Sequence, residues 1–205
     1  MGLFGPPNIK KLEEKGKIQE LLKILGDRKM DEQTRVVAGS ALGRLHVIEA
    51  IEPIIQRGTF GGHWIHETLQ DALLDIGAPA INPLISQFDQ GISNSFAEGC
   101  LVRFGAQAVD PLIEAMQSNN SRRASQAASL LAKIGAPAFD AMVTLLTSPD
   151  AQLRAPAAWI LGKMRDVRAI QPLIITLQDS KANVRENAIE ALAAFHSAEA
   201  VEPIV

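Results

Sequence analysis

The chain has 205 residues, 47% of them hydrophobic and 4% aromatic, and its formal net charge is −3. This apolar content excludes a disordered chain, and the near balance of charge gives no global field that would attract nucleic acid or an anionic membrane. Cys100 is the single cysteine, so no disulfide can form within the chain, and a cytoplasmic location is expected.

The first sixteen residues are expected to form an N-terminal cap, a short amphipathic stretch that Gly16 interrupts. They lack the basic region and apolar run of a secretory signal. Pro6 occupies the position at which a myristoylation pattern needs Ser or Thr. No window approaches 18 uninterrupted apolar residues, so no membrane-spanning helix is predicted.

From residue 17 onward, one phrase recurs: an apolar residue, a polar residue, Pro and two aliphatic residues. Its copies read AIEPII, AINPLI, AVDPLI, AFDAMV, AIQPLI and AVEPIV. The prolines stand at positions 53, 83, 111, 172 and 203, with Ala141 in the fourth copy, so the period is about 30 residues. Such a period predicts a stack of repeated structural units.

A second pattern precedes each phrase, in TRVVAGSALGRL, IHETLQDALLDI, SNSFAEGCLVRF, RASQAASLLAKI, LRAPAAWILGKM and VRENAIEALAAF. Small and apolar residues recur there at i, i+3 and i+4, which is one face of an α-helix. One row of this stripe holds Ala38, Leu69, Ala97, Ala127, Ala157 and Ala188. Gly77, Gly105 and Gly135 follow these helices, where a left-handed cap belongs.

Each repeat is therefore predicted to be two antiparallel helices, a helix A that begins with the proline phrase and a following helix B. The fold class is all-α: a right-handed α-α superhelix of about six two-helix repeats. We expect one domain, with repeats over residues 17–205 and the last repeat incomplete. Pro156 should kink the fifth B helix or delay its start.

The phrases VRENAIEALAAF and VRAIQPLIITLQDS resemble HEAT-like repeats of the short type found in the phycobilin lyase family. The family's Arg near the start of helix B is present as Arg35, Arg154 and Arg185, and His66, Asn94 and Ala124 replace it in the middle repeats. The resemblance implies an α-solenoid and leaves the function open, because this fold serves many functions.

Catalytic chemistry has few candidates. His63, His66 and Glu67 are spaced to approach one metal, but a single helix turn offers too few ligands, so no metal is expected. Deoxyhypusine hydroxylase, another HEAT-like protein, binds two irons through several His-Glu pairs, whereas this chain has one aligned pair. Cys100 replaces Ala, Leu or Ile of the stripe and is expected to be a small buried residue. No catalytic residue and no cofactor are predicted.

The candidate binding surface is the non-core face of the B helices. Aromatic residues there stand where sister repeats hold polar residues, which suggests partner anchors. Residues 58–102 contain no Lys or Arg, whereas residues 103–185 carry a net positive charge. The predicted partner-binding residues are Trp64, Phe96 and Trp159, flanked by Asp71 on one side and by Arg122, Lys133 and Lys163 on the other.

The leading hypothesis is a non-enzymatic scaffold or adaptor that binds a protein or peptide on the B-helix face. The alternative is a role similar to the phycobilin lyases, in which the chain helps to attach or detach a tetrapyrrole. Nucleic acid is a minor alternative, because the pI of about 5.8 is far below that of typical nucleic-acid-binding domains. The C-terminal edge at Ile204 and Val205 is expected to self-associate or to dock on a partner.

Overall fold

The computed structural model describes residues 7–90 and 95–195. Every regular element in these two ranges is helical, and neither range contains a strand, so the all-α prediction is confirmed. The chain divides into two compact units, unit 1 up to Phe104 and unit 2 from Gly105. The single-domain organisation stays a prediction.

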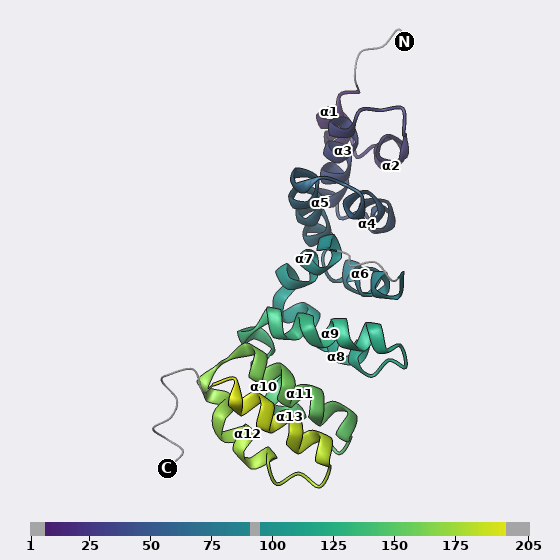
Figure 1. Ribbon diagram of the computed structural model, residues 1–205. Helices are drawn as coiled ribbons and strands as arrows, with labels where there is room; N and C mark the ends of the chain where they lie inside the picture. The colour runs from purple at the N-terminus through teal and green to yellow at the C-terminus, as the bar shows by residue number, and fades with distance from the viewer. Residues whose placement is uncertain (1–6, 91–94, 196–205) are drawn as a thin grey trace. The chain divides into compact units, whose positions relative to one another are not determined.

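Unit 1 contains a short first helix followed by three antiparallel helix pairs (Figure 1). Three single turns of 3-10 helix, Ile48–Ala50, Ala78–Ala80 and Gln87–Gln90, adjoin the A helices. The α-helices are α1 (Ile9–Glu14), α2 (Ile18–Gly26), α3 (Glu32–Arg44), α4 (Ile51–Thr59), α5 (His63–Ile76), α6 (Ile81–Ser86) and α7 (Ser95–Phe104).

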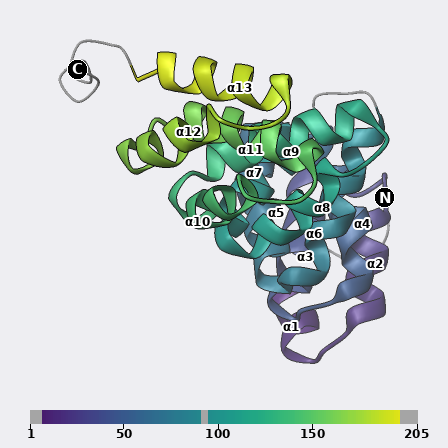
Figure 2. The same ribbon diagram turned by 90° about the horizontal axis from the view of Figure 1, so that it is seen from below.

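Unit 2 repeats the same arrangement with three further pairs, visible from a second direction in Figure 2. The 3-10 turns Gly105–Ala108 and Val167–Ala169 precede its first and last A helices. Its α-helices are α8 (Val109–Met116), α9 (Ser121–Ile134), α10 (Ala136–Leu145), α11 (Ala151–Met164), α12 (Ile170–Thr176) and α13 (Ala182–Ala193). The described ranges thus hold six A–B pairs, as the period predicts.

The core of each unit lies where small residues let helices approach closely. The predicted stripe is confirmed, because its six members from Ala38 to Ala188 are fully buried. Gly43 of α3 faces the backbone of Ala72 in α5, and Gly162 of α11 faces Ala191 of α13, with no room for an added Cβ. Neighbouring B helices therefore pack almost backbone to backbone within each unit. Stacking is what buries the stripe, because one helix pair cannot cover it alone.

The turns after the B helices require a positive φ. Gly77, Gly105 and Gly135 have φ values of 88°, 54° and 70°. His46 and Arg165 occupy the same place in sister repeats with φ values of 53° and 52°. The repeat geometry thus imposes a conformation that favours glycine even where the sequence supplies another residue.

Helix starts depend on capping side chains. Asp31, Asn120 and Asp150 each accept a backbone N–H of the first turn of the following B helix. Of the two effects expected of Pro156, the delayed start is wrong, because α11 begins at Ala151 and runs through Pro156; the kink stays a prediction. The side chain of Asp150 caps the first turn of α11, and Pro156 lies further inside, where it lacks the N–H that would bond the Gln152 carbonyl oxygen.

The N-terminal helix α1 is fastened to the first repeat. Ile9 is buried, and the guanidinium of Arg44 on α3 donates to both carboxylate oxygens of Glu13 at 2.6 and 2.8 Å. This ion pair lowers the pKa of Glu13, chiefly through the hydrogen bonds from Arg44. At the other end, the sixth phrase with Ile204 and Val205 lies outside the described residues.

Candidate partner-binding surfaces

Trp64 lies in the first turn of α5 and is 51% exposed. Its neighbours along the helix are polar, since Glu67 is exposed and the hydroxyl of Thr68 donates to the Trp64 carbonyl oxygen. The predicted exposure of Trp64 is therefore confirmed. An indole in this position contributes little to the core of unit 1.

Phe96 does not lie on the exposed face, and the prediction that placed it there is wrong. Its side chain on α7 is fully buried, and its ring lies edge-on to the ring of His66 with centroids 5.5 Å apart. The ring occupies the space beside Gly58 of α4, where an added Cβ would overlap it. Phe96 is a core residue of unit 1 and cannot reach a partner in this arrangement.

The sequence of the A helices contained an indication that Phe96 is buried. At the position of Gly58, sister repeats hold Phe88, Met116 and Leu146, which are buried, and Leu177, which is partly buried. Glycine at this position removes a large side chain from one layer of the core. Phe96, from the B helix of the next repeat, fills the vacated volume.

Trp159 on α11 is half-buried, so its predicted exposure is met only in part. It lines a small recess with Glu190 and Ala191 of α13 and with Ala194, the residue that follows this helix. The ammonium of Lys163 lies 5.4 Å from the centre of its ring, a cation–π distance. Trp159 therefore has structural contacts in unit 2 and retains one accessible edge.

The predicted charged residues are all exposed. Asp71 on α5 pairs with Arg103 on α7 at 2.5 Å, so its charge is partly neutralised within unit 1. Arg122 and Lys133 on α9 and Lys163 on α11 belong to unit 2. Trp64 and Asp71 thus both belong to unit 1, and Trp159 belongs to unit 2 with the three basic residues, of which Lys163 lies beside its ring.

Residues considered for chemistry have structural surroundings. Cys100 is fully buried, and burial raises the pKa of its thiol to about 12, so the expectation of a small buried residue is confirmed. His66 is partly buried with its Nε2 unpartnered, while the side chain of His63 lies outside what the structure describes. Among the described residues, no three His, Cys, Asp or Glu side chains come together as metal ligands would.

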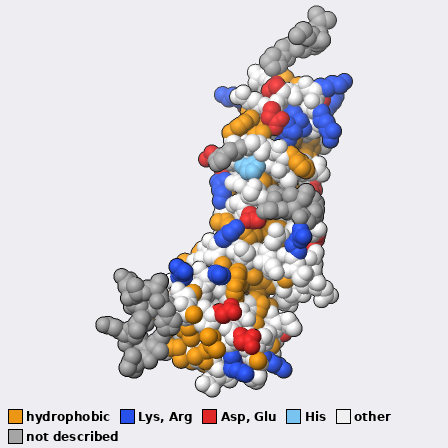
Figure 3. All heavy atoms as spheres, viewed as in Figure 1, with side chains coloured by type: hydrophobic (Ala, Val, Ile, Leu, Met, Phe, Trp, Pro, Cys, Tyr) orange, Lys and Arg blue, Asp and Glu red, His pale blue; other side chains and the backbone are white. Residues whose placement is uncertain are grey.

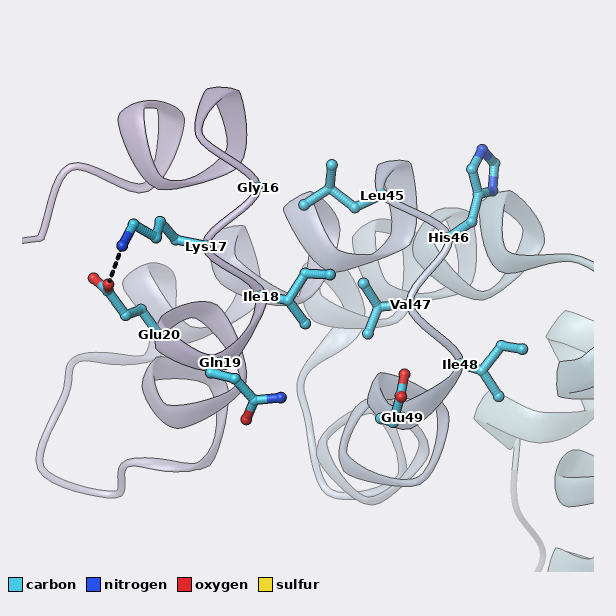
Figure 4. Close-up of a pocket in the computed structure, with 10 residues that line it drawn as sticks. All are labelled: Gly16, Lys17, Ile18, Gln19, Glu20, Leu45, His46, Val47, Ile48 and Glu49. Atoms are coloured by element: carbon cyan, nitrogen blue, oxygen red, sulfur yellow. Dashed lines mark ion pairs between the residues drawn. The ribbon is translucent and has the colours of Figure 1, made fainter.

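A recess of about 890 Å³ in unit 1 lies between the turn that precedes α2 and the turn that follows α3. Figure 4 shows Ile18 and Val47 pointing toward one another across it, while His46 points away. Lys17 and Glu20 form an ion pair of 3.5 Å at its rim. No predicted partner-binding residue lines this recess.

A second recess, of about 280 Å³, was missed at the sequence level. It is lined by three arginines and by Phe60, which is 84% exposed on the turn between α4 and α5. The signal was present in the phrase RGTFGG, which places an aromatic residue among glycines, but sequence spacing alone could not bring it next to arginines of the preceding repeat.

Together, the fold and these surfaces define an α-α repeat protein with two-helix units of about 30 residues. Residues 139–205 match the family model of HEAT repeats. The same kind of helix pair recurs before residue 139, so the rest of the described chain is built of units similar to the matched HEAT repeats. No curated protein matches it. In the described residues, no helix is both long enough and apolar enough to cross a membrane.

Solved structures of similar fold come from several kinds of protein. Human deoxyhypusine hydroxylase in complex with glycerol is 17% identical, over 91% of this chain and 76% of that chain, with a TM-score of 0.41. The CpcE–CpcF complex of phycocyanin lyase from Nostoc sp. is 18% identical, over 91% and 85%, with a TM-score of 0.37. A designed armadillo repeat protein in complex with the peptide (KR)4 is 20% identical, over 93% and 87%, with a TM-score of 0.36. Such distant likeness carries no argument about function.

Proposed function

We propose that this HEAT-like protein is a non-catalytic scaffold that binds a protein or peptide partner along its B helices. The observation that carries the proposal is the exposed indole of Trp64, 51% accessible on the first turn of a B helix. Tryptophan is among the residues most enriched at the energetic centres of protein interfaces. Its apolar surface gives a favourable free energy only when a partner removes it from water.

In unit 2, Trp159 and Lys163 support the same proposal. An accessible aromatic edge beside an exposed ammonium offers a partner one apolar contact and one charge. Arg122 and Lys133 add positive charge on the neighbouring helix α9. Charges at the rim of a surface favour orientation and association rate more than affinity, so the aromatic residues are proposed as anchors.

The test compares two truncations of exposed hydrophobic side chains. Trp64→Ala removes the proposed anchor, whereas Ile48→Ala removes a side chain that is 59% exposed on the turn before an A helix. Neither change should shift the free energy of unfolding by more than about 0.5 kcal/mol, because neither side chain is buried. Partners captured by the wild-type protein are identified by mass spectrometry, and each purified partner is then titrated against both variants.

We expect Trp64→Ala to weaken partner binding roughly 30-fold, which corresponds to about 2 kcal/mol. Ile48→Ala should change it by less than about twofold. Equal binding by the two variants would refute the B-helix face as the binding surface. Loss of folding in Trp64→Ala would place the indole in the core and contradict its exposed position in the structure.

A further inference from the structure

We propose that unit 1 has a second binding surface, the Arg recess, which accepts an acidic segment of a protein partner. The Arg recess is lined by Arg28, Arg35, Arg57 and Phe60, together with Leu25, Gly26, Pro53 and Gln56. Trp64 does not line it, so the inference is independent of the B-helix surface. In Figure 3, Lys and Arg side chains gather over the α1–α2 end of unit 1.

Three successive parts of the chain bring the arginines together. Arg28 lies on the turn between α2 and α3, Arg35 on the first turns of α3, and Arg57 near the end of α4. The recess is therefore a product of stacking the first repeat on the second. Phe60, directly after α4, supplies an aromatic edge at the rim.

The guanidinium groups are only partly satisfied. Nε of Arg35 donates to the carbonyl oxygen of Leu25 at 3.0 Å, and Arg57 pairs with the carboxylate of Glu32. Within the described ranges, Arg28 forms no ion pair and no side-chain hydrogen bond. One carboxylate thus serves three guanidinium groups, which leaves positive charge for a ligand.

The acids that flank Arg28 in the sequence, Asp27 and Asp31, do not offer their carboxylates to the recess. Asp27 accepts the backbone N–H of Lys29, and Asp31 accepts both the N–H and the hydroxyl of Thr34. These carboxylates are committed to the turn and to the helix cap, and neither lines the recess. A carboxylate from outside would therefore be the complementary group.

Arg57 independently indicates that a hydrogen-bond acceptor is missing from the recess. Its Nε is buried and has no hydrogen-bond partner, a condition that is rare in native proteins. Burial also lowers the pKa of this guanidinium, because desolvation disfavours its charged form. A carboxylate bound beside Arg57 would compensate for that desolvation.

The shape of the recess favours a peptide over a small anion. Its volume of about 280 Å³ exceeds what a single carboxylate fills, and Pro53, Leu25 and Phe60 contribute apolar surface to it. Guanidinium groups recognise carboxylates through paired N–H donors, and aromatic rings stack on extended side chains. An Asp or Glu next to an aromatic or aliphatic residue fits both features.

The test uses two variants that each remove one positive charge from the same turn. Arg28→Gln alters the Arg recess, whereas Lys29→Gln alters an exposed neighbour that does not line it. Short random peptides are selected by display on the full-length wild-type protein. Enriched peptides are then synthesised with a fluorescent label and titrated against both variants and Phe60→Ala by anisotropy.

We expect the selected peptides to be rich in Asp and Glu beside an apolar residue. They should bind Arg28→Gln roughly tenfold more weakly and Lys29→Gln within about twofold of wild type, because a lost charged hydrogen bond costs about that factor. Phe60→Ala should also weaken them, and raised salt should weaken all binding. The proposal is overturned if no acidic enrichment appears, if Arg28→Gln binds as well as wild type, or if inorganic phosphate displaces the peptides far more strongly than chloride does at the same ionic strength.

Discussion

The burial of Phe96 against Gly58 can be tested by a pair of substitutions, because the effect of Gly58→Ala on stability should change sign when Phe96→Ala is also present. Phe96→Ala removes a fully buried ring, so we expect it to lower the free energy of unfolding by about 3–5 kcal/mol. Gly58→Ala alone should cost about 1–3 kcal/mol, because its Cβ would overlap the ring.

In the Phe96→Ala background the ring is absent, and the same Gly58→Ala change should become stabilising. Alanine is favoured over glycine in a helix by about 1 kcal/mol, and the new methyl group partly fills the cavity. The two substitutions are therefore predicted to be strongly non-additive, as contacting residues are. This inversion distinguishes direct contact from two independent effects.

Denaturant unfolding followed by fluorescence measures these values in unit 1. Each unit contains one tryptophan, Trp64 in unit 1 and Trp159 in unit 2, so a Trp159→Phe background leaves Trp64 as the reporter. If Phe96→Ala costs less than about 0.5 kcal/mol, as a change on an exposed face would, the burial of Phe96 is refuted. Additive effects of Gly58→Ala and Phe96→Ala would refute the contact between them.

Three further predictions follow from the repeats. Arg165→Gly should raise the free energy of unfolding by about 0.5–1 kcal/mol in denaturant titrations, since φ is positive there, and His46→Gly should gain less because its ring contacts the Asp75 carbonyl oxygen. The hydrogen bonds from Arg154 lower the pKa of Asp179, so this ion pair should stabilise unit 2 at pH values above the ordinary Asp pKa and lose its effect as pH falls through the lowered pKa. Asp179→Asn should therefore reduce the midpoint of unfolding at neutral pH. A difference between wild type and Asp179→Asn that persists in strong acid would contradict this. Cys100 should resist alkylation in the folded protein and react at once in denaturant, because its pKa is raised to about 12 by burial; rapid labelling of folded protein would contradict it.

Sequence spacing alone determined the helical repeat and most of its core. The i, i+3, i+4 stripe of the B helices and the 30-residue period depend on local geometry, because each helix must turn the same face toward its neighbours. The same periodicity placed the positive-φ turns at Gly77, Gly105 and Gly135. It also identified Trp64 as exposed, because the equivalent positions of the other B helices hold mostly polar residues, which do not belong to the core.

Only the tertiary structure decided the features that depend on contacts between side chains of neighbouring repeats. Phe96 shares its helix position with Thr68, yet it is buried because Gly58, in the preceding repeat, leaves a volume that Phe88, Met116 and Leu146 fill elsewhere. Filling a volume is a relation between side chains on different helices, and a period read along one helix cannot express it. The Arg recess arises for the same reason, since its three arginines lie on separate elements and meet only when the first two repeats stack.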